Sequence, residues 1–213
     1  YEIASRLSYF LWASMPDDAL FGAAAEGQLA TASGLQEQVV RMLASDRAST
    51  LATRFGAQWM GLTELQLEGG VPVADNVRDA MYQETIHLFE AFVRDPGIPL
   101  KQLVSADFTF LNGPLAAHYG IPGVTGNEMR QVSTEGFPDR RGIMTHGGML
   151  AVNSLGISYP AIRRGLWVTS NILCNSVPPP PAGIDTSPPE GLPADASTRE
   201  LLAAHRADPA CAG

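Results

Sequence analysis

The sequence has little cysteine, no block of lysine or arginine, and no long hydrophobic run. Two cysteines, Cys174 and Cys211, are too few for a disulfide framework. They also cannot build a zinc site without histidines at a matching spacing. One disulfide between them stays open as an alternative, and so does the burial of Cys174 as a small hydrophobic side chain.

The charge pattern excludes one class of partner and the hydropathy pattern excludes another. The net charge is -8, and affinity for a polyanion needs clustered cations, so we expect no nucleic-acid partner. The longest apolar runs, such as residues 148–152, are far shorter than the roughly 18 residues that a membrane-spanning helix needs. We therefore expect no transmembrane segment.

Both ends of the sequence indicate a piece of a longer protein. There is no initiator Met, and the first residues have the pattern of an amphipathic helix rather than a signal peptide. The last residues, from Pro209 to Gly213, carry no charge and no helix stop signal. We expect any export signal to lie outside this sequence.

Helical spacing dominates the first hundred residues. Ile3, Leu7, Phe10 and Leu11 form one apolar stripe, and Pro16 ends that predicted helix. The next predicted helices begin at Asp17 or Asp18, at Ser33, and at Asp46, and the last of these carries Leu51, Phe55, Trp59 and Leu62. A fifth carries residues 77–92 and stops before Pro96. The three tryptophans fall on helix faces, where core packing explains them.

The second half of the sequence mixes short elements. We predict strands at residues 107–112 and 129–133, helices at 113–119, 141–152 and 159–174, and a final helix capped by Ser197. Prolines make residues 177–194 a semi-rigid, extended connector. The fold class predicted from these patterns is mainly α: a multi-helical, bundle-like domain with a few short strands or extended segments.

The sequence offers few candidates for chemistry. Glu84 and His87 form one Glu-x-x-His unit, but a di-iron site needs two copies and two further carboxylates, so we interpret the unit as a solvated helix face. No metal site is predicted. The surroundings of Ser154 lack the glycines of a nucleophile elbow, and Gly147 and Gly148 lack a phosphate-binding Lys-Ser/Thr pair, so we interpret these glycines as a flexible loop.

His146 is the histidine that we single out as a cofactor-binding candidate. Adjacent glycines permit close backbone approach, and Met144 and Met149 supply sulfur nearby. A structural histidine with satisfied hydrogen bonds is the interpretation that the pattern favours more. The pairs Arg140-Arg141 and Arg163-Arg164 anchor loops by bonding carboxylates or helix ends, or receive the carboxylates of a cofactor or ligand. No catalytic residue is identified.

Several segments, in order along the chain, resemble a known pair of domains. Residues 4–12 and 15–18 resemble the opening of the domain DUF1592, and residues 107–112 and 118–123 resemble its closing part. Residues 140–146 and 163–168 and the run from Ile172 to Pro181 resemble the adjoining domain DUF1588. The resemblance implies a DUF1592-like region at 1–125 and a DUF1588-like region at 126–213. Residues 157–160 depart from the family pattern.

The resemblance also implies a location and a cofactor. Relatives are large exported proteins of planctomycetes, myxobacteria and related bacteria, often with haem-c-like or carbohydrate-binding modules. In them the segment that resembles residues 205–213 is followed by Cys-His, which completes the haem-attachment motif Cys-x-x-Cys-His. Cys211 is then the first thioether cysteine, and haem c belongs to the full-length parent and is absent from this fragment.

Two functions from different classes follow from these observations. The first is a helical module of an exported, periplasmic or surface protein whose parent carries haem and takes part in redox chemistry or electron transfer. The second is a non-redox binding or scaffold module for a polysaccharide or a protein. The expected partners are the other domains of the same chain, together with an electron-transfer or polysaccharide partner. A di-iron enzyme built on Glu84 and His87 ranks last.

Overall fold

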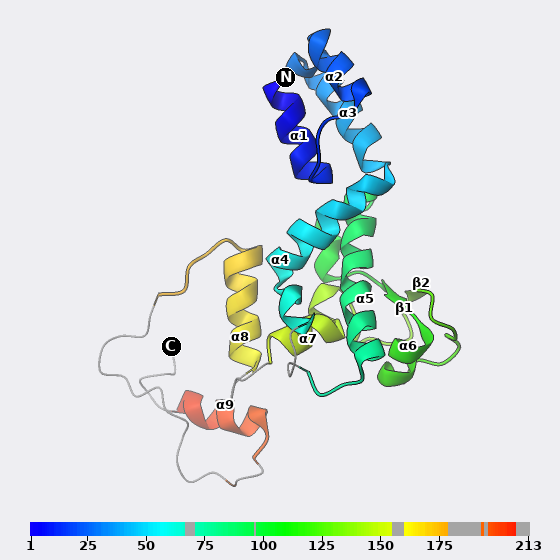
Figure 1. Ribbon diagram of the computed structural model, residues 1–213. Coiled ribbons are helices and arrows are strands. Elements are labelled where there is room, and N and C mark those ends of the chain that lie inside the picture. The colour runs from blue at the N-terminus through cyan, green and yellow to red at the C-terminus, as the bar shows by residue number, and fades with distance from the viewer. Residues whose placement is uncertain (67–70, 96, 155–159, 179–192, 194–195, 208–213) are drawn as a thin grey trace. The chain divides into compact units, whose positions relative to one another are not determined.

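The chain was analysed as a computed structural model, which describes residues 1–66, 71–95, 97–154, 160–178, 193 and 196–207. It divides into two compact units, Tyr1–Val152 and Asn153–Gly213, and each is described by itself. In the described residues helices dominate and the strands are short, which confirms the predicted mainly α fold class (Figure 1). No helix among these residues is long and apolar enough to cross a bilayer.

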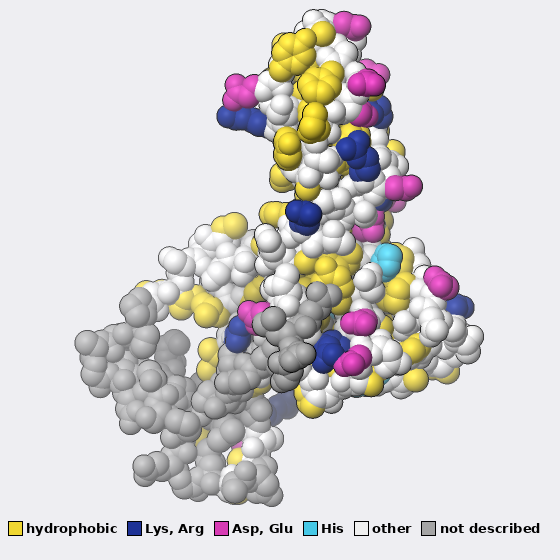
Figure 2. All heavy atoms as spheres, viewed as in Figure 1, with side chains coloured by type: hydrophobic (Ala, Val, Ile, Leu, Met, Phe, Trp, Pro, Cys, Tyr) yellow, Lys and Arg dark blue, Asp and Glu magenta, His cyan; other side chains and the backbone are white. Residues whose placement is uncertain are grey.

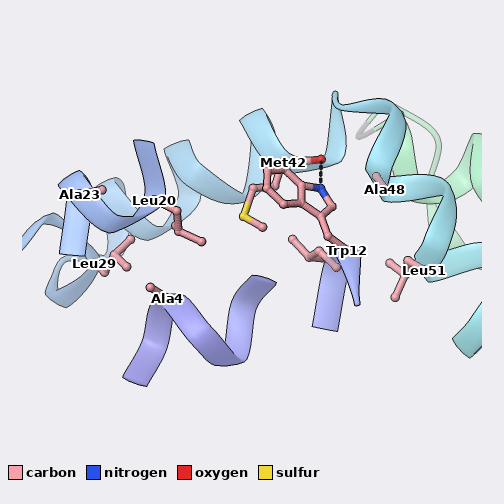
Figure 3. Close-up of a cluster of buried hydrophobic side chains, with 9 residues drawn as sticks. Ala4, Trp12, Leu20, Ala23, Leu29, Met42, Ala48 and Leu51 are labelled. Carbon is pink, nitrogen blue, oxygen red and sulfur yellow. Dashed lines mark hydrogen bonds between the residues drawn. The ribbon is translucent and has the colours of Figure 1, made fainter. Parts of the chain in front are cut away.

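The first unit begins with a group of short helices. They are α1 (Glu2–Trp12), α2 (Asp18–Ala25), η1 (Gln28–Ala30), α3 (Ala32–Leu43) and η2 (Asp46–Ala48). Their buried side chains form one apolar cluster around Trp12, Leu20 and Met42 (Figure 3). The indole N–H of Trp12 donates to the Met42 carbonyl at 3.0 Å, and the Arg47 guanidinium lies 4.2 Å from the centre of the ring. Core packing therefore accounts for Trp12, as its helix position predicted.

The buried face of α1 differs from the predicted apolar stripe. Ile3 and Phe10 are 45% and 60% exposed, whereas Ala4 and Ser8 are fully buried. Small side chains on the inward face let α1 approach its neighbours closely. A hydropathy pattern does not detect this, because it scores polarity and not side-chain size. The prediction was wrong for Ile3 and Phe10.

The predicted helix starts shift by one or two residues, because hydroxyl side chains compete for the cap. The Thr31 hydroxyl, rather than that of Ser33, accepts the Gly34 N–H at 3.1 Å at the start of α3. Ser45, rather than Asp46, caps the next turn by accepting the N–H of Arg47.

The predicted fourth helix is broken into shorter pieces. It comprises η3 (Leu51–Gly56), which is wound as a π-helix, α4 (Ala57–Met60) and η4 (Leu62–Gln66). Gly61 has a φ of 71°, and this left-handed conformation ends α4 before Leu62. The break separates Leu62, which is fully buried, from the helix face of Phe55, which is 49% exposed.

The long helix α5 (Asp75–Arg94) organises the rest of the first unit. It contacts η3 and η4 and also η5 (Leu100–Val104), β1 (Phe108–Leu111), α6 (Gly113–Tyr119) and α7 (Gly147–Val152) (Figure 1). At its end Arg94 donates to the carbonyls of Leu43 and Ser45 at 3.1 and 2.9 Å. The helix thereby joins the apolar cluster around Trp12 to the elements that follow it.

The short strands and the helix between them form as predicted. β1 pairs antiparallel with β2 (Arg130–Ser133), with Phe108 opposite Ser133. Between the strands, Asn112 caps α6 by accepting the Leu115 N–H, and Gly120 ends the helix at a φ of 71°. A second apolar cluster joins α5 to this part of the fold through Met81, Leu111 and Leu115.

The predicted helix over residues 141–152 is interrupted at His146. The chain forms η6 (Ile143–Thr145), then turns extended at His146 (φ −65°, ψ 139°), and then forms α7. This interruption lets the His146 side chain point into the core of the unit, where it is 2% exposed.

The second unit contains α8 (Pro160–Trp167), which continues as the π-wound η7 (Val168–Ile172), and α9 (Thr198–Ala207). Ser197 caps α9 as predicted, because its hydroxyl accepts the Glu200 N–H while Glu200 accepts the Ser197 N–H. Cys174 is exposed. The predicted connector at 177–194 lies almost entirely outside the described residues, as does Cys211.

Candidate functional site

A group of polar side chains is buried in the first unit. The polar cluster, as we name it, consists of Glu84 and Thr85 from α5, Thr109 from β1, Tyr119 from α6, and His146 from the turn before α7. Glu84 is 1% exposed and His146 is 2% exposed. The carboxylate and the imidazole therefore lie together away from solvent, beside the partly buried phenol of Tyr119.

Glu84 is the centre of the polar cluster. Its Oε1 accepts the Thr109 hydroxyl at 2.8 Å, and its Oε2 accepts the Tyr119 hydroxyl at 2.6 Å. The interpretation of Glu84 as part of a solvated helix face was therefore wrong. The partners come from β1 and α6, which local helix spacing does not reveal. A buried carboxylate is tolerated here because both of its oxygens accept hydrogen bonds.

His87 does not join Glu84 in a common site. Its Nδ1 lies 3.9 Å from Glu90 Oε2, and its ring centre lies 5.5 Å from that of Phe110. The described residues hold no group of three or more His, Cys, Asp or Glu side chains placed to bind a metal ion. The two side chains of this Glu-x-x-His unit therefore lie in different surroundings: the carboxylate is buried and the imidazole is half-exposed.

Tyr119 links Glu84 to the start of α7. Its hydroxyl donates to Glu84 and accepts the backbone N–H of Gly147 at 2.8 Å. The Arg140 guanidinium carbon lies 3.5 Å from the centre of the Tyr119 ring, in a cation–π arrangement. Burial raises the pKa of the Tyr119 phenol far above its ordinary value, and the charge of Glu84 raises it further. The phenol stays protonated and acts as a hydrogen-bond donor.

His146 lies between two threonine hydroxyls. Its Nδ1 is 3.1 Å from Thr85 Oγ1, and its Nε2 is 3.3 Å from Thr109 Oγ1 and 4.0 Å from Glu84 Oε1. Burial lowers the pKa of the imidazole below its ordinary value. The nearby Glu84 charge opposes this shift and the Arg140 charge adds to it. We therefore take the ring as neutral at neutral pH.

The glycines after His146 serve close packing rather than loop flexibility. Both are buried at the start of α7. A Cβ on Gly147 would lie 2.5 Å from Tyr119 Oη, and a Cβ on Gly148 would lie 3.0 Å from the Met81 carbonyl oxygen. The flexible-loop interpretation was wrong, because the chain needs these residues to bring the α7 backbone against α5 and Tyr119.

The position of Glu84 on the apolar side of α5 indicates its burial, although the Glu-x-x-His motif does not. On α5, Glu84 lies three residues after Met81 and four before Leu88, and both of these are buried. A carboxylate on the apolar stripe of a helix is expected to have buried partners. Nothing in the sequence identifies Thr109 and Tyr119 as those partners, because they are 25 and 35 residues away.

The other predicted site residues lie apart from the polar cluster or outside the described residues. Cys211 has no described surroundings, and its role as a thioether cysteine stays a prediction. Both ring nitrogens of His146 face threonine hydroxyls, and a role in binding a cofactor stays a prediction for this residue as well. Arg163 and Arg164 lie on α8 in the second unit.

Comparison with protein families places these residues in context. The family model for PSD4, a protein of unknown function (DUF1592), matches residues 1–121, which is more than half of the chain. The chain belongs to the DUF1592 family. A second model, for PSCyt3, a protein of unknown function (DUF1588), matches residues 140–213 of this DUF1592 protein. No curated protein and no solved structure matches the sequence.

The polar cluster draws on both matched segments. Glu84, Thr85, Thr109 and Tyr119 lie in the DUF1592 match, whereas His146 lies in the DUF1588 match. The compact unit that ends at Val152 therefore includes the first residues of the DUF1588 match. The predicted boundary between residues 125 and 126 stays a prediction about the family domains.

Proposed function

We propose that this chain is a helical scaffold module of an exported multidomain protein, and that the longer protein carries covalent haem c through Cys211. The scaffold part rests on one observation: the polar groups of the cluster bond to one another and lie buried in the core. Such a cluster holds α5, β1, α6 and α7 in one arrangement.

The haem part of the proposal rests on the position of Cys211 in the sequence. Cys211 lies within the DUF1588 match, and the family resemblance implies that it corresponds to the first cysteine of a Cys-x-x-Cys-His motif. The residues present do not complete this motif, since its second cysteine and its histidine are not among the 213 residues. Covalent haem on this segment requires residues that follow Gly213 in the longer protein.

Expression of the longer natural chain tests the haem part. It is expressed with a cytochrome c maturation system, and we expect a Soret band and haem that stays attached in a denaturing gel. Cys211→Ala halves the thioether attachment and lowers the yield of attached haem, whereas Cys174→Ala, the matched control, leaves it unchanged. Absence of covalent haem from the unmutated chain rejects this part of the proposal.

We also place the module outside the cytoplasm, in the periplasm or on the cell surface, with an electron-transfer protein as partner. Support comes from the family resemblance, in which relatives are exported. The test is fractionation of the native organism with an antibody against residues 1–152. Recovery in the cytoplasmic fraction alone rejects this location.

The alternative is a non-redox module that binds a polysaccharide, and a group of exposed aromatic rings favours it. Phe10 and Phe55 are 60% and 49% exposed, and their ring centres lie 6.4 Å apart. The rings of Phe55 and Trp59 are nearly parallel, at 3°. Hydrophobic side chains also reach the surface over α1–α3 (Figure 2). Aromatic faces of this kind are suited to stacking against sugar rings.

A glycan array separates the alternative from the leading proposal. Binding that survives Cys211→Ala and is lost in Phe55→Ala supports a polysaccharide module. Absence of glycan binding by the unmutated chain rejects it. Tyr9→Ala is a matched control, because Tyr9 is also exposed (58%) and is not among the rings that contact Phe55.

A further inference from the structure

The hydroxyl protons around His146 are already used. The Thr85 hydroxyl donates to the Met81 carbonyl at 3.3 Å, and the Thr109 hydroxyl donates to Glu84 Oε1 at 2.8 Å. Each hydroxyl has one proton. When both protons are donated in this way, the two hydroxyls can only accept from the imidazole.

A neutral imidazole cannot satisfy two acceptors, because it carries a single N–H. Nδ1 is the nitrogen closer to its threonine, at 3.1 Å, and a proton there donates to Thr85. Nε2 then faces Thr109 at 3.3 Å and Glu84 at 4.0 Å without a proton between them. In the closed form a proton on Nε2 would therefore have only the Thr109 hydroxyl oxygen within hydrogen-bond distance, because Glu84 Oε1 is 4.0 Å away and the ring is 2% exposed.

We propose that His146 is a proton-uptake switch: in mild acid its Nε2 takes a proton when η6 and α7 move away from α5, and this proton favours the open segment. The Gly147 N–H donates to Tyr119 of α6 at 2.8 Å and so ties this segment to the rest of the unit. The Leu150 N–H donates to the His146 carbonyl at 2.9 Å, within the segment, and so closes the first turn of α7 onto His146.

Several nearby groups affect how readily the His146 imidazole takes up a second proton. From α5, Glu84 favours it; from the loop before η6, Arg140 opposes it; and from α6, Tyr119 faces Glu84 with its proton in place. η4, which packs against α7, carries Glu64 on its exposed side. Burial is the largest of these effects and disfavours the charged ring. Proton uptake therefore favours conformations in which His146 reaches water.

The direction of the pH effect follows from the burial of His146, which disfavours the charged ring in the closed form. When the segment opens, His146 regains its ordinary pKa of about 6.5 and binds a proton that the closed form lacks. Closing is then fully favoured above that pH and is progressively lost as the pH falls below it. Each pH unit raises the opening equilibrium constant by up to about tenfold. This inference does not rest on the haem proposal.

Hydrogen exchange of the Gly147 and Leu150 amides in the full 213-residue chain tests the proposal. After correction for the intrinsic exchange rate, we expect protection to fall by up to about tenfold per pH unit below about pH 6.5. His146→Gln, which cannot titrate, removes this dependence. His118→Gln is the matched control, because His118 is exposed, and it keeps the dependence. Equal pH dependence in His146→Gln and in the unmutated chain overturns the proposal.

A second measurement covers the case in which His146→Gln does not fold. The ring of His146 is followed by NMR in the unmutated chain as the pH is lowered. We expect protonation below the ordinary midpoint of about 6.5, accompanied by loss of protection at Gly147. Protonation at or above that midpoint, or protonation that leaves exchange unchanged, overturns the proposal.

Discussion

The phenol of Tyr119 donates a 2.6 Å hydrogen bond to Glu84 Oε2, across 35 residues of sequence. The same oxygen of Tyr119 accepts the Gly147 N–H. One side chain thus satisfies a buried carboxylate and the first amide of α7 together, and it connects the parts of the chain that match the two family models.

Tyr119→Phe should destabilise the first unit. The substitution removes the partner of Glu84 Oε2 and the partner of the Gly147 N–H, and unsatisfied buried polar groups cost about 1–3 kcal/mol. Urea unfolding followed by circular dichroism measures the loss in free energy of unfolding. Tyr9→Phe serves as the control, because Tyr9 is 58% exposed. Equal midpoints for the two variants would contradict the structural role of this hydroxyl.

Stability should also fall in alkali. In the folded protein Tyr119 keeps its proton well above the ordinary phenol pKa of about 10, whereas the unfolded chain releases it there. The folded state then binds more protons, so unfolding becomes easier as the pH rises above about 10. Burial raises the pKa of Tyr82 as well, so Tyr119→Phe should reduce this dependence without removing it. Tyrosinate absorbance and circular dichroism, recorded together on the unmutated chain and on Tyr119→Phe, should show that the Tyr119 phenol ionises only on unfolding.

Gly142→Ala should be far more disruptive than Gly27→Ala. Both glycines have positive φ, 63° and 75°. A Cβ on Gly142 would lie 2.2 Å from the Val104 carbonyl carbon, whereas at Gly27 nothing lies within 4 Å. Gly27 has the left-handed helical conformation, which costs a non-glycine residue about 1–2 kcal/mol. Gly142, with a ψ of 175°, has a conformation that essentially only glycine adopts, which costs about 1–3 kcal/mol, and the backbone clash should add about 1–3 kcal/mol. Thermal unfolding of the two variants compares them directly, and equal losses would exclude the close approach.

A chain of residues 1–139 should not fold cooperatively, whereas residues 1–152 should. The shorter chain lacks Ile143 and Met149, which are fully buried, and also His146, so the apolar face of α5 and the Glu84 carboxylate lose partners. Calorimetry is the measurement, with binding of an apolar dye as a second readout. A sharp transition in the shorter chain would mean that the DUF1592 match is self-sufficient.

Local patterns anticipated the elements better than they anticipated the contacts. The span of α5, the strand at Phe108 and the cap at Ser197 follow from periodicity and capping chemistry. The inward face of α1 could not be found in this way, because Ala4 and Ser8 are buried for their small size. Hydropathy favours Ile3 and Phe10, which remain exposed.

The candidate site was harder to predict than the fold. His146 stood out from its neighbours in the sequence, but Glu84 seemed solvated because its partners lie on β1 and α6. Pairing between distant segments depends on how the helices pack, and single-sequence spacing carries little information about that. Gly147 and Gly148 show the same limit. Glycine occurs both where the backbone must pack closely and where it must be flexible, so the sequence alone does not separate the two cases.

The bonds of Arg94 to the carbonyls of Leu43 and Ser45 attach the last residue of α5, while the polar cluster attaches the middle of the same helix at Glu84. Ten residues separate Glu84 from Arg94, which is about 15 Å of helix. A tilt of α5 at the polar cluster therefore pulls on the turn after α3, directly beside the Met42 carbonyl that holds the Trp12 indole. The fluorescence emission of Trp12 should therefore change when the packing around Glu84, at the middle of α5, is disturbed.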